Sequence, residues 1–221
     1  MNKKTLYILL LIFIYNSHIL ANDLKTIKEK LGTNKLLVEK KRLEGPWPRL
    51  TIYTTIASSP LEAMAVYAAY PDQIHFVPGI IKATVTEQKN GSEVTVDYEF
   101  DLPWPLSTSE YSHWHKVSKY QDGYKLEWNM TKSDASKKTQ GYVIFLPKDK
   151  NSSYVLYQNF FYPTSFFAGA LRPTFISDTQ ETLQAIFDYT IKLKKDKPEL
   201  LSKYKKWIED SINGKNVFLK K

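Results

Sequence analysis

Residues 93–100 read Glu-Val-Thr-Val-Asp-Tyr-Glu-Phe, and they give the clearest secondary-structure signal in the chain. Apolar side chains stand at every second position from Val94 to Phe100, with polar side chains between them. Because successive side chains of a strand point to opposite faces, the segment predicts a strand with one dry and one wet face. Asn90-Gly91, just before it, is typical of a tight hairpin turn. We therefore expect an antiparallel sheet whose apolar face is buried against another element.

Similar alternation continues on both sides of this segment, so we expect the middle of the chain to be sheet. The strand-like stretches are 50–57, 81–86, 94–100, 107–119, 124–131, 141–146 and 154–162. Asp122-Gly123 predicts a second hairpin turn between two of them. The stretch 154–162 is apolar on both faces, which predicts a strand covered on both sides. Residues 35–43 are less regular, and a strand is one interpretation of them.

Helical signals frame these strands. Ser59 as N-cap and Pro60 at the first helical position predict a helix start. Residues 23–32 have the pattern of a short amphipathic helix. Asp178-Thr-Gln-Glu181 is similar to a capping box and predicts the start of a long helix, and Pro198 predicts the start of another.

The long helix is expected to cover the dry face of the sheet. Its predicted apolar stripe is Leu183, Ile186, Phe187, Thr190 and Ile191. The predicted fold class is α+β, with a curved antiparallel sheet wrapped around a long C-terminal helix. A helix does not fill the concave side of such a sheet, so we expect an apolar cavity there.

The N-terminus has the layout of a secretory signal. Met1–Lys4 is basic, Leu6–Tyr15 is almost continuously apolar, and Ala21 offers a cleavage position. Ten apolar residues are too few to cross about 30 Å of hydrocarbon as a helix. We expect an exported chain, periplasmic or secreted, and a retained N-terminal anchor is the alternative. The predicted division is 1–21 signal peptide, 22–48 N-terminal extension, 49–195 main domain, and 196–221 basic C-terminal helix and tail.

Composition narrows the chemistry. The 221 residues contain no Cys, which excludes disulfides, thiolate metal sites and a Cys nucleophile. The formal charge is +8, and many of the lysines follow Lys192. A basic helix face can meet an anionic membrane surface or simply be solvated. Export argues against a nucleic acid partner.

Several segments resemble one family when they are taken in order. They are Ile56-Ala-Ser-Ser-Pro-Leu-Glu-Ala63, Tyr67, Tyr70-Pro71, Phe76-Val-Pro-Gly79, Tyr157, Phe161 and Ala185-Ile-Phe187. Over residues 50–195 the chain resembles the START-like (SRPBCC) superfamily, in particular its polyketide-cyclase and coenzyme Q-binding-protein branch. The resemblance implies a helix-grip fold and binding of lipids, isoprenoids, quinones or polyketides, with a minority of members being enzymes. The signal, the N-terminal extension and the extra basic helix depart from the simplest members and count against an intracellular role.

Aromatic residues dominate the expected inner face, and we predict that they line a site for a hydrophobic small molecule or lipid. The candidate ligand-binding residues are Tyr98, Phe100, Tyr111, His113, His115, Trp128, Met130, Tyr157, Phe161, Phe166, Phe167 and Phe187. Plain core packing is the alternative for each of them. An interaction module whose interior is filled by its own side chains is the corresponding alternative for the whole chain.

The segment 160–173 is an apolar loop between the last strand and the closing helix. We predict that it gates the cavity and contacts a membrane through Phe166, Phe167, Leu171 and Arg172. A loop folded onto its own core is the alternative, because loops normally run over the surface.

His113 and His115 share one face of a strand, a spacing that a metal ion could use. A third ligand would have to come from His75 or a carboxylate, and a polar pocket rim is the more ordinary interpretation. We expect no metal and no cofactor. The alternative function is a cyclase- or hydrolase-like enzyme, with His113, His115, Tyr111 and Tyr98 as acid-base candidates.

Overall fold

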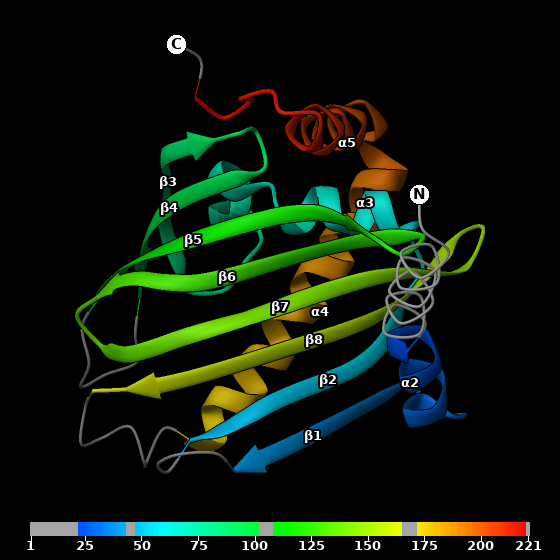
Figure 1. Ribbon diagram of the computed structural model, residues 1–221, viewed down its shortest axis with the longest axis horizontal. Coiled ribbons are helices and arrows are strands. Elements are labelled where there is room, and N and C mark those ends of the chain that lie inside the picture. The colour runs from blue at the N-terminus through cyan, green and yellow to red at the C-terminus, as the bar shows by residue number, and fades with distance from the viewer. Residues whose placement is uncertain (1–21, 43–46, 102–107, 165–171, 220–221) are drawn as a thin grey trace, which may run out of the picture.

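The computed structural model describes residues 22–42, 47–101, 108–164 and 172–219. The strands are β1 (Leu36–Arg42), β2 (Pro48–Ile56), β3 (Ile80–Lys89), β4 (Glu93–Phe100), β5 (Ser109–Tyr120), β6 (Gly123–Ser133), β7 (Ser136–Asp149) and β8 (Ser152–Pro163). They form one eight-stranded antiparallel sheet in the order β1-β2-β8-β7-β6-β5-β4-β3 (Figure 1). The predicted antiparallel sheet is confirmed. The predicted signal peptide lies outside the described residues.

Helices pack on both faces of this sheet. They are α2 (Asn22–Leu31), α3 (Pro60–Tyr67), the 3-10 helix η1 (Tyr70–His75), α4 (Arg172–Asp196) and α5 (Pro198–Ile212). The predicted start of α3 is confirmed, because Ser59 and Glu62 form a complete capping box. Among the residues that the structure describes, no helix is both long enough and apolar enough to cross a membrane.

The concave face of the sheet carries the main core. Its strand residues include Ile52, Val96 and Leu126, all 0% exposed. Helix α4 crosses this face diagonally, as the closing helix was predicted to do (Figure 1). Helices α3 and α5 contribute to the same core, including Met64 and Tyr204. The long helix covers this face as expected, and it shares the face with α3 and α5.

The N-terminal extension covers part of the opposite face. Ile27 and Leu31 of α2 pack in a second core with Leu156 of β8 and Ile144 of β7. This confirms that the last strand is covered on both sides. The extension also supplies β1, which pairs with β2 along its whole length.

Three details differ from the sequence-based expectation. The second hairpin turns at Gln121-Asp122, and Gly123 is already paired in β6. Gly123 is required for space rather than for turning, since a Cβ there would lie 1.9 Å from the Phe145 carbonyl oxygen. Helix α4 begins at Arg172, six residues before the predicted start, and Asp178 lies within it. The earlier start is possible because the first turn of a helix tolerates a proline at its second position. Ile191 is 39% exposed, and the buried stripe continues through Leu193 instead.

Candidate functional site

The concave face of the sheet changes character along its strands. At the end beneath α3 and α5, Val94, Val117 and Leu126 are at most 4% exposed. At the other end, where β4 ends and β5 begins, the inward side chains are only half-buried. They are Phe100, Tyr111, His113, Met130 and Phe161. The inward side chains are therefore fully buried at one end of the face and half-buried at the end where α4 begins.

Two histidines and three tyrosines form a continuous cluster on this face. Tyr98 Oη of β4 lies 3.4 Å from His115 Nε2 of β5. The His115 ring lies 4.8 Å from the ring of Tyr70, which belongs to η1, and 5.8 Å from the ring of His113. The ring of Tyr111 lies 4.8 Å from the ring of His113 and is tilted by 38° to it. The cluster thus runs from the half-buried end of the face to its sealed end.

Burial keeps the members of this cluster uncharged. It lowers the pKa of His113 to about 4, and together with His113 it holds the pKa of His115 well below the usual 6.5. Burial raises the pKa of Tyr98 and of Tyr111 well above 10. At neutral pH the site therefore presents neutral imidazoles and protonated phenols.

Tyr111 and His113 are largely surrounded by protein without being fully buried. Desolvation is the main cause of the pKa shift of each. Each nevertheless keeps part of its surface accessible. Both lie on the face where the sequence predicted a ligand to bind.

Trp128 forms the wall beside the cluster. Its ring lies 5.4 Å from the ring of Tyr157 on β8 and 6.4 Å from the ring of Tyr67 on α3. Trp128 Nε1 donates to Asn159 Oδ1 at 3.4 Å. Phe187 of α4 is buried in the same core, 8% exposed. The predicted inner-face residues are thus brought together by four strands and one helix.

A second aromatic group stands where α4 begins. Trp47 packs edge-on against Phe161 at 5.4 Å and against Phe175 of α4 at 5.2 Å, and the latter two rings stack at 5.3 Å. This group ties the first turns of α4 to β8. The predicted gate residues Phe166, Phe167 and Leu171 lie outside the described residues. Arg172 is the first residue of α4.

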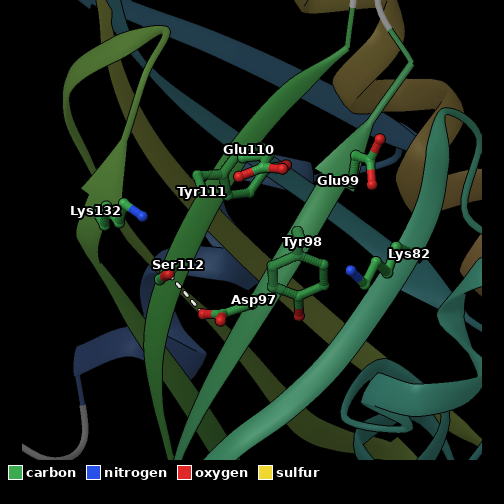
Figure 2. A pocket seen from close by; sticks show the side chains of 8 residues that line it. All are labelled: Lys82, Asp97, Tyr98, Glu99, Glu110, Tyr111, Ser112 and Lys132. Atoms are coloured by element: carbon green, nitrogen blue, oxygen red, sulfur yellow. Dashed lines mark hydrogen bonds between the residues drawn. The ribbon is translucent and has the colours of Figure 1, made fainter.

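Two hollows lined wholly by described residues lie along the sheet. One, of about 120 Å³, is bounded mainly by charged side chains, among them Lys82, Glu99 and Lys132, and also by Tyr98 and Tyr111 of the cluster (Figure 2). There Ser112 donates to Asp97 at 2.6 Å. The other, of about 520 Å³, borders Lys41 and Arg49. Both have the polarity of solvated surface, so neither suits an apolar ligand.

Acid-base catalysis and metal binding by His113 and His115 would each require a further partner group. Within the described ranges, no hydrogen bond joins His113 or His115 to a carboxylate, so an oriented acid-base pair is not formed. In the same ranges, no three potential metal-ligating residues of the His, Cys, Asp and Glu types gather in one place. His75 is exposed on η1. The two histidines therefore act as part of a neutral hydrogen-bonding surface.

Sequence reasoning missed several members of this site. Tyr67 and Tyr70 entered only as part of a family resemblance, because a helical segment does not reveal which sheet positions it meets. Trp47 and Phe175 were not singled out, although Pro46-Trp47-Pro48 is a conspicuous apolar corner. Asn159 was missed because one amide in an apolar strand has no distinctive spacing. Its signal is the amide pair Gln158-Asn159 inside 154–162, a stretch whose other side chains are aliphatic or aromatic.

Comparison with known proteins gives likeness in structure only. Neither a family model nor a curated sequence matches the chain. A STAR-related lipid transfer protein from Xanthomonas axonopodis superposes with a TM-score of 0.63 at 15% identity, covering 71% of this chain and 93% of that chain. Human STARD10 gives 0.61 at 10% identity, covering 85% and 86%. The Zhui aromatase/cyclase from Streptomyces sp. R1128 gives 0.57 at 10% identity, covering 67% and 96%. At such identities the likeness establishes the fold, and this chain has the α+β helix-grip fold of the START-like proteins.

Proposed function

We propose that this protein binds and carries a hydrophobic small molecule, lipid-, isoprenoid- or quinone-like, between its sheet and α4. One observation carries the proposal: inward side chains stay half-buried at the end of the concave face where α4 begins. Apolar side chains inside a domain normally pack to high density. Aromatic side chains with open surface and a few polar tips are the usual lining of a small-molecule site.

The energetics suit a carrier. Burying about fifteen methylene groups gains about 12 kcal/mol at about 0.8 kcal/mol each. Immobilising the ligand costs at least about 4 kcal/mol. The remainder of at most about 8 kcal/mol corresponds to micromolar binding at best. A ligand held this way can be released again to a membrane, which a carrier requires.

The site favours a carrier over an enzyme, while the comparisons fit both. One similar structure is named a STAR-related lipid transfer protein, and another is named an aromatase/cyclase. An acid-base enzyme would need a group to orient and charge His113 or His115. The described residues supply no carboxylate partner for either.

Location and delivery are part of the same proposal. We place the carrier in the cell envelope, as the N-terminal signal pattern predicts, and assign membrane contact to Phe166, Phe167, Leu171 and Arg172. Lys203 and Lys206 lie on the exposed side of α5 and suit an anionic membrane surface. N-terminal sequencing of the envelope fraction should give a chain that begins at Asn22. A start at Met1 would support the retained anchor instead.

Native mass spectrometry followed by organic extraction tests the binding itself. Protein purified from its own envelope should carry an apolar molecule, or should take up fluorescent fatty alcohol or isoprenoid probes. Changing Tyr111 to Lys should abolish uptake, because it places a charge in the open part of the site. Changing Thr84 to Lys on the exposed outer side of β3 is the matched control. Empty protein that takes up no probe would refute the carrier.

A further inference from the structure

Two buried polar atoms at the inner end of the site lack a partner. Tyr70 Oη and His115 Nδ1 make no hydrogen bond to any residue that the structure describes, and the two residues are only 1% and 6% exposed. Buried polar groups without partners are rare and cost free energy. Since both belong to rings whose centroids lie 4.8 Å apart, the unmet hydrogen-bonding capacity is concentrated in one place.

The hydrogen bond between Tyr98 and His115 determines whether His115 Nδ1 can donate or accept a further hydrogen bond. Tyr98 Oη and His115 Nε2 are 3.4 Å apart. If the phenol donates, the neutral imidazole carries its proton on Nδ1 and can donate it. If the phenol accepts, Nδ1 holds a free lone pair. Tyr70 Oη can both donate and accept. A ligand oxygen that reaches either atom therefore supplies the partner it lacks.

The surroundings favour an uncharged oxygen. Burial alone raises the pKa of Tyr70, and burial and His113 account for that of His115. The groups that act on Tyr98 are likewise tyrosines, namely Tyr67, Tyr70 and Tyr111. Among these causes there is no lysine or arginine to pair with a carboxylate or phosphate, and no acid to pair with an amine. An ion placed here would remain uncompensated at low dielectric.

The far side of this place is closed by the C-terminal tail. The Phe218 ring lies 5.4 Å from the Tyr70 ring. Gln88 Oε1 of β3 accepts from the Phe218 backbone N–H at 2.9 Å. Asn216 Oδ1 accepts from the Gly91 N–H at 3.1 Å in the β3–β4 turn. A ligand would therefore approach from the open end, passing Tyr111 and His113, with its terminal group leading.

We propose that Tyr70, Tyr98, His113 and His115 form a subsite for an uncharged oxygen group, a hydroxyl or a carbonyl, at the leading end of the hydrophobic ligand. This inference rests on the proposed function and specifies its ligand class. Fatty alcohols, prenols, sterols, ketones and quinones fit it. Fatty acid anions, phospholipid headgroups entering first, and alkylamines do not.

Displacement of a bound fluorescent apolar probe by dodecanol, dodecanoate and dodecylamine at neutral pH tests the subsite. Dodecanol should bind about tenfold more tightly than either ion, since one or two neutral hydrogen bonds are gained and no charge is buried. Tyr70→Phe should remove most of this preference while keeping apolar binding. Tyr154→Phe, on the outer face beside α2, should leave it unchanged.

The outcomes separate this inference from the carrier proposal. Equal binding of the three probes, or tighter binding of dodecanoate, would overturn the subsite and leave the carrier standing. A preference that survives both Tyr70→Phe and His115→Phe would also overturn it. If no probe and no dye bind at all, both proposals fall together.

Discussion

The ring of Trp128 on β6 lies directly over Gly141 on β7, so that a Cβ at Gly141 would lie 2.4 Å from Trp128 Cζ2. The two residues are paired across the sheet. The missing side chain lets the indole lie flat against the strand, where it meets Tyr157 and Asn159. A glycine inside a strand normally weakens the sheet. At position 141 the candidate site requires one, because a side chain would displace Trp128.

Gly141→Ala should lower stability and disturb the site together. The added Cβ also meets the Gln158 carbonyl oxygen at 2.2 Å, so both the backbone and Trp128 must shift. We expect a loss of about 1–3 kcal/mol in the free energy of unfolding, measured in urea. Near-ultraviolet circular dichroism should report the displaced indole. In Trp128→Leu the same glycine change should cost less, although not nothing, because the carbonyl contact remains. Equal costs in both backgrounds would contradict the Trp128–Gly141 contact.

His113 should make stability depend on pH in a defined window. Its pKa is about 4 in the folded chain and 6.5 in the unfolded chain. As the pH falls from about 6.5 towards 4, His113 binds a proton in the unfolded chain but not in the folded chain. The free energy of unfolding therefore falls. Above that window the effect is absent. Its full size is at most about 3 kcal/mol, reduced because the side chain keeps some open surface.

Urea unfolding of the wild type and of His113→Gln at about pH 7 and pH 5 measures this effect. The variant should lose less stability on acidification than the wild type. His75→Gln, at an exposed position of η1, should behave as the wild type does. Identical pH dependence in all three proteins would mean that His113 is not held neutral by burial.

The C-terminal helix should be a structural part of the domain. Tyr204 of α5 is 1% exposed and donates to Asp72 Oδ2 of η1 at 2.7 Å. A hydrogen bond to a charged group contributes about 1.5–3 kcal/mol. We expect Tyr204→Phe to lower the free energy of unfolding by about that amount. Tyr162→Phe, half-buried at the end of β8, is the comparison. No difference between the two variants would show that α5 is only loosely docked.

Helix α2 should stabilise the sheet from its outer side. Ile27 is 0% exposed and packs in the second core. Ile27→Ala should cost about 2–5 kcal/mol. Leu36→Ala, at a position 46% exposed on β1, should cost little. Limited proteolysis should then cut the Ile27→Ala variant earlier within residues 22–35. Unchanged stability and cleavage would show that α2 is dispensable.

Phe166→Ser with Phe167→Ser should slow exchange of a fluorescent ligand with vesicles while leaving the melting temperature nearly unchanged. The proposed gate requires these two side chains to contact the membrane rather than to stabilise the fold. Phe161→Ser is the comparison, because its ring packs against Trp47 and Phe175. It should lower the melting temperature clearly. An unchanged exchange rate in the double variant would refute the gate.

The strand segments and most helix limits could be predicted from the sequence because they depend on local physical rules. Alternation of apolar and polar residues specified β4, the Asn90-Gly91 turn specified the hairpin before it, and Ser59-Pro60 specified the start of α3. The start of α4 was misplaced because a capping-box pattern inside a helix looks the same as one at its end. Gly123 was misassigned to a turn because crowding by a neighbouring strand leaves no local signal.

Local sequence patterns were enough to predict that one face of the sheet is apolar, rich in aromatic rings, and covered by helix. How completely that face is covered depends on the packing of segments that are distant in the chain. Helices α3 and α5 seal one end, leaving Tyr111 and His113 half-buried at the other, and η1 brings Tyr70 onto His115. Strand periodicity tells which way a side chain points. Which residues the side chain contacts depends on segments that are far away in the chain, and a local pattern does not specify those contacts.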